Sequence, residues 1–175
     1  MTADASPFAI RPARADDAAR ICVIYNHHVT DTTVTFDETP LEAREMARRI
    51  RAATLPWLVI EDTGVLAGYA RASTWKTRAA YRYTVESSVY VDAPFHRRGH
   101  GRRIYEALLV ELRRRDVHVV LAGIALPNPA SIALHERMGF THCGAIRQVG
   151  FKFGRWLDLA FYQLILATPL EPTDG

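Results

Sequence analysis

Residues 84–103, TVESSVYVDAPFHRRGHGRR, join a strand-like segment to a basic loop that contains two glycines. Along TVESSVYV mostly apolar side chains alternate with a second set that includes Glu86 and Tyr90, which is typical of a half-buried strand. A helix is predicted from about Arg102 to Arg115, because its apolar residues recur at helical spacing. The basic loop therefore lies between the end of a strand and the beginning of a helix.

The loop HRRGHG, residues 96–101, favours an anionic ligand. Backbone N–H groups at a helix N-terminus lack internal partners and lie at the positive end of the helix dipole. Gly99 and Gly101 let the backbone come close to an anion such as a pyrophosphate. An exposed basic surface is the first alternative and a polynucleotide site the second, because glycine-rich motifs often occur without a ligand. The loop lacks the patterns of a P-loop and of the dinucleotide fingerprint.

Apolar periodicity and turn residues divide the rest of the chain into short strands and helices. Further strands are expected at residues 8–13, 57–62, 65–74, 117–126, 139–150 and 155–166. Helices are expected from Asp16 or Asp17 through Tyr25, from a capping box at Thr39 and Glu42 through Ala53, and from Ala130 to Met138. Residues 27–40 are expected to be a polar loop. The continuous apolar run at 117–126 predicts a central strand covered on both faces.

The resulting order, β-α-α-β-β-β-α-β-α-β-β, predicts an α+β (α/β layered) domain with a mixed sheet and helices packed on it. No repeat or linker interrupts the chain, so residues 1–175 are interpreted as one domain with a core at about 8–167. The segments through Ser6 and from Glu171 onward are expected to be loose ends.

Composition restricts the class of protein. With 49% hydrophobic and 23% charged residues the chain has a globular composition. A net charge of +3 is mild, so nucleic acid is not the expected partner. Cys22 and Cys143 form no CxxC pair, which favours a reducing compartment over a disulfide framework or zinc site. No signal peptide and no apolar run of about 20 residues is present, so we expect a cytoplasmic protein without a membrane partner.

The loop at 96–101 resembles the Q/R-x-x-G-x-G/A pyrophosphate loop of the GNAT superfamily of acetyl-CoA-dependent N-acetyltransferases, although His96 replaces the usual Gln or Arg. Four further stretches resemble one branch of that family, the phosphinothricin and methionine sulfone or sulfoximine N-acetyltransferases. They are IYNHHVTDTTVTFDETP (24–40), TVESSVYV (84–91), NPASIALHERMGF (128–140) and QVGFKFGRWLDLAFYQL (148–164). The resemblance extends from Ile10 to Leu166. It implies the GNAT fold, with a central mixed, mostly antiparallel sheet and a splayed strand pair for acetyl-CoA.

Acetyl transfer from a thioester to an ammonium needs a base, a polarised carbonyl and a departing thiolate. Glu86 matches the glutamate that the resemblance implies as general base. Its alternative interpretation is a carboxylate on a solvated strand face. His135 occupies the place where many relatives carry a tyrosine general acid, and it is the candidate for protonating the thiolate. A lone helical histidine is more often structural, so that alternative stays open.

The cofactor-binding prediction follows the same resemblance. Backbone N–H groups of Val89, Tyr90 and Val91 are the expected donors to the thioester carbonyl. Asn128 and Ser131 are expected beside the pantetheine arm, although Asn128 could equally be a turn residue at a helix entry. The loop residues assigned to the pyrophosphate are His96, Arg97, Arg98, Gly99, His100, Gly101 and Arg102.

The acceptor site is expected to hold the carboxylate of an amino acid with an arginine. Arg82 aligns with an arginine of the resembling enzymes, and Arg78 is the second candidate. Thr33, Phe36 and Trp75 are expected to line the pocket, with simple packing as an equally good account of each. His27 and His28 are adjacent in sequence, which does not place them on one helix face as ligands, and no metal is expected.

Together these patterns predict an N-acetyltransferase that moves an acetyl group directly from acetyl-CoA to a small amino acid or analogue. The resemblance also implies a homodimer. The alternatives are acetylation of another amine, such as a protein N-terminus or lysine, and a non-catalytic module that binds CoA or nucleic acid.

Overall fold

The computed structural model describes residues 8–166, which form seven strands and four helices in the predicted order. The predicted loose ends, and residue 167 of the predicted core, lie outside the described residues. The elements are β1 (Phe8–Pro12), α1 (Ala18–Asp31), α2 (Ala43–Ala52), β2 (Trp57–Asp62), β3 (Val65–Thr74), β4 (Thr84–Val91), α3 (His100–Arg113), β5 (Val119–Ala125), α4 (Pro129–Arg137), β6 (Thr141–Lys152) and β7 (Arg155–Ile165).

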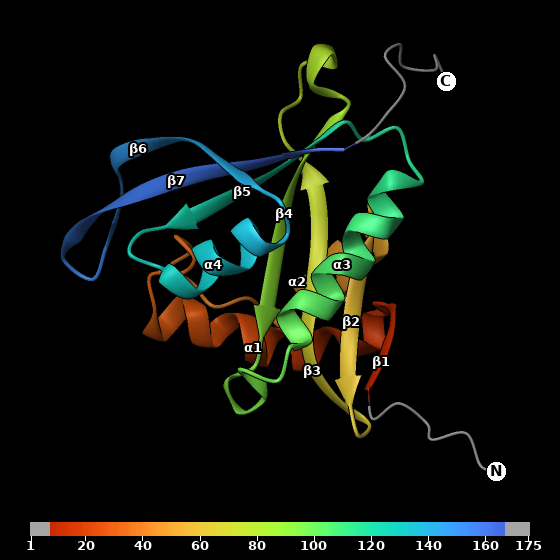
Figure 1. Ribbon diagram of the computed structural model, residues 1–175. Coiled ribbons are helices and arrows are strands. Elements are labelled where there is room, and N and C mark those ends of the chain that lie inside the picture. Colours follow the sequence, from red (N-terminus) through yellow and green to blue (C-terminus); the bar gives the residue numbers. More distant parts are fainter. Residues whose placement is uncertain (1–7, 167–175) are drawn as a thin grey trace.

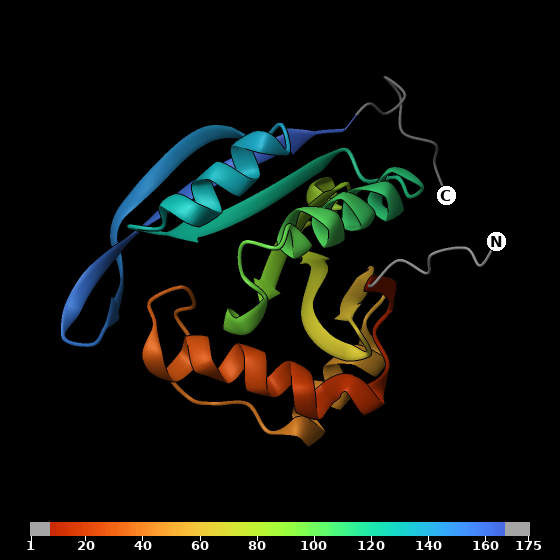
Figure 2. The same ribbon diagram turned by 60° about the horizontal axis from the view of Figure 1, so that its bottom comes forward.

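The seven strands form one sheet in the order β1-β2-β3-β4-β5-β7-β6. Within the described chain β4 and β5 are parallel and every other neighbouring pair is antiparallel. The prediction of a mixed, mostly antiparallel sheet is therefore confirmed. Helices α1 and α2 cover one face of the sheet, and α3 and α4 lie on the other (Figures 1 and 2). Each face has its own apolar core.

The parallel pair separates part-way along its length. Pairing of β4 with β5 ends at Glu86 and Leu121, although β4 continues to Val91 and β5 to Ala125. Beyond that point β4 keeps its bonds to β3, and β5 keeps its bonds to β7. The two strands consequently diverge in Figure 1. This is the predicted splayed pair, and it leaves the edges of two strands facing one another without bonds between them.

Strand β5 departs from its predicted burial. Val120, Ala122 and Ile124 are buried, whereas Gly123 between them is exposed. The strand is central, but only the face toward α3 is fully covered. The reason is that α1 packs on β3 and β4, so the second layer does not close over the split. The continuous apolar run could not reveal this, because alanine and glycine suit either environment.

Three predicted helix boundaries are wrong. Helix α1 continues to Asp31, so His27 and His28 belong to it rather than to a loop, because Val29 extends its buried face. Helix α3 begins at His100 instead of Arg102, directly after Gly99 in the left-handed conformation (φ 81°).

The third wrong boundary is the beginning of α2. This helix begins at Ala43 after Glu42, without the predicted capping box at Thr39. The Asn26 side chain accepts from the Leu41 N–H and donates to the Leu41 carbonyl, both at 2.9 Å. The entry to α2 is therefore held by α1, a tertiary contact, rather than by a local cap.

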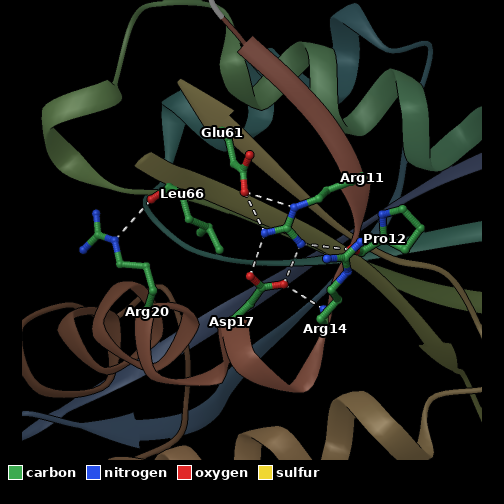
Figure 3. A network of polar contacts seen from close by, with 7 residues as sticks. All are labelled: Arg11, Pro12, Arg14, Asp17, Arg20, Glu61 and Leu66. Carbon is green, nitrogen blue, oxygen red and sulfur yellow. Dashed lines mark hydrogen bonds and ion pairs between the residues drawn. The ribbon is translucent and has the colours of Figure 1, made fainter. Parts of the chain in front are cut away.

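A polar network fixes the start of α1 against the sheet (Figure 3). The Arg11 guanidinium on β1 bonds the Asp17 carboxylate at 2.7 Å and the Glu61 carboxylate of β2 at 2.6 Å. Asp17 also accepts from the Arg14 backbone N–H at 2.7 Å. Hydrogen bonds from Arg11 lower the pKa of Asp17 below its ordinary value.

Among residues 8–166 no helix has the length and apolar character needed to cross a membrane.

Candidate active site

Glu86 lies at the fork where β4 leaves β5. It is opposite Ser73 of β3 and belongs to the last residue pair that joins β4 to β5. Its side chain is half-buried on the face of the sheet that carries α1, together with Ser88 and Tyr90. A Cβ atom at Gly123 would lie 3.3 Å from Glu86 Oε1, so this glycine leaves room for the carboxylate. Burial raises the pKa of Glu86, which suits a general base.

A narrow cleft of about 50 Å³ occupies the split between the strands. Most of its lining comes from β4, β5 and α4, and Val34 of the loop after α1 closes one side. The cleft brings together predicted residues that are far apart in sequence: Val89, Tyr90, Asn128, Ser131 and His135. Residues 89–91 pair with β3 and have no strand partner on the side of β5. That edge offers backbone groups to a ligand.

His135 is 4% exposed on α4. Its Nδ1 lies 2.7 Å from the Ser131 carbonyl oxygen. The centroids of the Tyr105 and Phe140 rings each lie 5.1 Å from the centroid of the His135 ring. Burial lowers the pKa of His135, because the charged imidazolium is poorly solvated there. The neutral ring therefore donates from Nδ1 to the carbonyl. Asn128 accepts from the Ser131 N–H at 3.1 Å, so it serves as the N-cap of α4 as well as lining the cleft.

The basic loop 96–101 turns tightly between β4 and α3. Arg97 and Gly99 both adopt positive φ, at 61° and 81°, and the His96 ring bonds the Val91 carbonyl at 2.8 Å. The side chains of His96, Arg97, Arg98 and Arg102 are exposed. The loop thus presents exposed cations beside the first N–H groups of α3.

The His100 side chain differs from the others, because it is 5% exposed and turned into the protein. Its Nε2 lies 2.9 Å from Asp62 Oδ2, and Arg98 reaches the same oxygen at 3.3 Å. Asp62 at the end of β2 therefore anchors the loop. Of His100, only the backbone remains for a ligand. Asp62 gave no signal in the sequence beyond its place in a strand-like segment.

Gly68 is a second residue that sequence reasoning missed. A Cβ atom there would lie 2.6 Å from the Tyr90 carbonyl oxygen and 3.1 Å from the Val91 Cα. The glycine allows β3 to approach β4 directly beside the basic loop. A glycine inside the strand pattern VLAGYARAST was the available signal, because such glycines often mark a close backbone approach.

The loop 32–40 covers the polar face of β4. The Tyr25 hydroxyl of α1 donates to Asp37, and the Phe36 ring lies over Gly150 of β6, where a Cβ atom would come within 2.6 Å of it. The buried Lys152, also of β6, donates to the Thr35 carbonyl at 2.9 Å. Phe36 and Thr33 belong to the same loop as Val34, which lines the cleft, and their role as pocket walls stays a prediction.

The remaining acceptor candidates divide into two groups. Trp75 packs edge-on against Phe161 of β7, which pairs with Gly123 beneath the Glu86 carboxylate. Arg78 and Arg82 are exposed. Arg82 lies on Tyr83 and lines a separate groove with Arg115. Within residues 8–166 neither arginine lines the cleft in the split or forms an ion pair with Glu86.

Within residues 8–166 no three His, Cys, Asp or Glu side chains form a group that could hold a metal ion. His27 pairs with Asp31 at 2.9 Å, and His28 packs its ring against Tyr90. That the protein uses no metal stays a prediction.

Comparison with known proteins accounts for this arrangement. The profile described as an acetyltransferase (GNAT) domain matches residues 10–161. The chain belongs to the GNAT acetyltransferase family. The fold predicted from the resemblance, and the family itself, are thereby confirmed.

Individual relatives cover nearly all of this GNAT acetyltransferase. It is 41% identical to the phosphinothricin N-acetyltransferase of Streptomyces viridochromogenes, over 98% of this chain and 95% of that protein. It is 43% identical to the L-methionine sulfoximine/L-methionine sulfone acetyltransferase of Salmonella typhimurium, over 93% of this chain and 97% of that protein. The structure of a putative acetyltransferase from Salmonella typhimurium with its cofactor acetyl-CoA superposes with a TM-score of 0.93 at 40% identity, covering 97% of this chain and 100% of that one.

Proposed function

We propose that this GNAT acetyltransferase moves the acetyl group of acetyl-CoA directly to the amine of a small amino acid or analogue, without an acyl-enzyme. The position of Glu86 carries the proposal, because it places a half-buried carboxylate of raised pKa at the fork beside an unpaired strand edge. The names of the relatives support phosphinothricin, methionine sulfone or methionine sulfoximine as acceptors.

The basic loop suits the pyrophosphate of acetyl-CoA. The exposed side chains of Arg97, Arg98 and Arg102 supply positive charge, and the first N–H groups of α3 supply donors. The substitution of His96 for the usual Gln or Arg is compatible with this role, since its ring is engaged by the Val91 carbonyl and the backbone does the binding. The pantetheine arm would then lie along the free edge of residues 89–91, between β4 and β5.

The chemistry assigned to Glu86 is removal of a proton from the acceptor ammonium. The free amine attacks the thioester carbon, and N–H donors at Val89–Val91 stabilise the negative charge that develops on the oxygen. The C–S bond then breaks and the thiolate of CoA takes up a proton. Holding both substrates in line within the split contributes much of the acceleration.

His135 is the proposed partner of the departing thiolate. It lines the same cleft as residues 89 and 90. With Nδ1 donating to the Ser131 carbonyl, Nε2 is the nitrogen left to exchange protons. Because burial keeps the ring neutral, His135 must first accept a proton at Nε2 before it can pass one to sulfur.

We further propose that two copies of the single domain associate through the β6–β7 hairpin, which extends beyond the helices (Figure 1). Its side chains Phe151, Phe153 and Trp156 are 53%, 57% and 62% exposed. Phe151 and Trp156 pair across the strands with ring centroids 5.1 Å apart. Clustered exposed aromatics of this kind mark an association surface. A cytoplasmic location is proposed on the sequence argument from the two free cysteines.

A thiol-release assay with acetyl-CoA tests the proposed function. The panel contains phosphinothricin, methionine sulfone, methionine sulfoximine, common amino acids, and a peptide with a free N-terminus and an internal lysine. We expect turnover with a small amino acid or analogue and mass-spectrometric detection of its N-acetyl product. Turnover of the peptide alone would favour the protein-acetylating alternative. Salt-sensitive DNA binding without any turnover would favour the non-catalytic one.

A further inference from the structure

This inference rests on the proposed function, whose amino-acid acceptor brings a carboxylate as well as an amine. The two arginines predicted from the sequence to bind that carboxylate do not line the cleft in the split. Arg82 bonds the Ala79 carbonyl and lies on the ring of Tyr83, and Arg78 is exposed. The face of the sheet that carries Glu86 offers another cation for the carboxylate.

Arg71 lies on that face, one strand away from Glu86. In the β3–β4 register Arg71 pairs with Ser88, whereas Glu86 pairs with Ser73. Arg71 and Glu86 are thus diagonal neighbours, a relation that places Cβ atoms about 7 Å apart on the same face. Both side chains are long enough to converge on a ligand between them.

The Arg71 guanidinium has no acidic partner in the part of the chain that the structure describes. It forms no ion pair with Glu86 or with any other carboxylate of residues 8–166, and none of its N–H groups makes a hydrogen bond there. Its contact is with the face of Trp57, 5.3 Å from the ring centroid. A guanidinium carries five donors in a planar fork that matches a carboxylate. The half-buried Arg71 guanidinium therefore lies on the Trp57 ring, and its N–H donors are available to a ligand.

The surroundings of Arg71 add positive charge and space. It lines a groove of about 270 Å³ between α2 and β3 together with Arg48 and Arg49. Those two arginines share one carboxylate, Glu45, so the groove keeps a net positive charge. Arg71 is also close enough to Glu86 to oppose the effect of burial on the pKa of that carboxyl. Arg71 and Glu86 thus lie on one face of the sheet, near enough to interact electrostatically without forming an ion pair.

We propose that Arg71 binds the carboxylate of the acceptor while Glu86 receives its ammonium group. An α-amino acid carries its two opposite charges one carbon apart, so it can bridge a carboxylate and a guanidinium that do not reach one another. The pair would fix the amine over the fork and select α-amino acids over amines that lack the carboxylate. A protein N-terminus has an amide in that position and would be rejected.

Steady-state kinetics on paired acceptors test the assignment. The pair is the best amino acid of the panel and its decarboxylated amine, for example methionine sulfone and 3-(methylsulfonyl)propylamine. Arg71→Met should raise KM for the amino acid about 10- to 100-fold, the size expected for losing a charge-assisted hydrogen bond. The KM for acetyl-CoA and the kcat/KM for the decarboxylated amine should change by no more than about twofold. Arg71→Lys, which keeps the charge and loses the fork, should fall between the wild type and Arg71→Met.

Arg44→Met, an exposed substitution on α2, serves as the matched control and should leave both acceptors unchanged. If Arg71→Met does not fold, Arg71→Gln replaces it. Equal loss with both acceptors would overturn the assignment, because it would indicate a structural role. Selective loss in Arg82→Met instead of Arg71→Met would also overturn it and would move the carboxylate to Arg82. Failure of the wild type to acetylate any amine would reject the proposed function itself, and this inference with it.

Discussion

The behaviour of single residues at the fork follows from burial and from the groups nearest to them. Glu86 has the face of the sheet on one side and the open position of Gly123 on the other, so its carboxylate is only partly solvated. A carboxyl in such surroundings holds its proton to a higher pH than usual. His135 is affected in the opposite sense, since burial keeps it neutral. The cleft thus contains His135, and Glu86 lies at the fork next to the cleft residues Ser87 and Gly123; His135 and Glu86 each have a shifted pKa.

Replacing Glu86 tests the base directly. Glu86→Gln keeps the shape of the side chain and removes its basicity, so kcat should fall about 100-fold or more. Glu106→Gln, on the exposed side of α3, is the matched control and should retain wild-type kcat. Wild-type turnover in Glu86→Gln would remove this residue from the mechanism.

The pH profile provides an independent measure. Burial raises the pKa of Glu86, so the carboxylate is lost as the pH falls through that raised value. In the wild type, kcat/KM should therefore decline on the acid side at a higher pH than an exposed glutamate would give. The residual activity of Glu86→Gln should lack this decline. An acid limb that persists unchanged in the variant would assign it to another group.

At the scale of elements, the contacts between the loop after α1 and the β6–β7 hairpin shape the acceptor side. Lys152 is buried and donates to the carbonyls of His28 and Thr35, at 3.3 and 2.9 Å. Phe36 occupies the space above Gly150. A strand near the end of the chain thereby fixes a loop near its beginning, over the polar face of β4.

Gly150→Ala tests this coupling. The new Cβ atom would come within 2.6 Å of the Phe36 ring, which must move and displace the loop. We expect KM for the amine to rise severalfold while KM for acetyl-CoA stays the same, because Phe36 belongs to the loop after α1 and not to the basic loop. When Phe36→Ala is already present, Gly150→Ala should lower kcat/KM less than it does in the wild type, because the ring it would displace is gone. A rise in both KM values would indicate a general disturbance of the sheet.

At the scale of the whole molecule, one sheet separates two apolar cores, and its far end is left uncovered. The helices cover the middle of the sheet, and the β6–β7 hairpin extends past them (Figure 2). The aromatic side chains Phe151, Phe153 and Trp156 of this hairpin are exposed. Burying such a surface in a second copy would remove several large rings from water, which is a favourable change.

Trp156→Glu should therefore convert a dimer into a monomer, as measured by light scattering after size-exclusion chromatography. The charge would have to be buried without a partner, and that cost opposes association. Val23→Glu, at a residue that is 58% exposed on α1, should leave the dimer intact. A wild-type protein that is monomeric at all concentrations would contradict the proposed assembly.

The sequence by itself determined the order of the elements, the helix faces and the place of the basic loop. These depend on periodicity and on glycine positions, which act over a few residues. The motif around Glu86 is also a local feature of the sequence, since a strand and the loop that follows it are adjacent in the chain.

Only the tertiary structure decided how the site is completed. The entry to α2 depends on Asn26, the basic loop is anchored by Asp62, and Arg71 approaches Glu86 through strand register. Each of these contacts joins residues at least fifteen positions apart, and the free energy of each comes from burial and pairing that exist only once the sheet has formed. Local sequence patterns carry no information about which strand becomes the neighbour of which. For that reason the sequence pointed to Arg78 and Arg82, which precede Glu86 in the chain, and not to Arg71, which reaches the face of Glu86 through the pairing of β3 with β4.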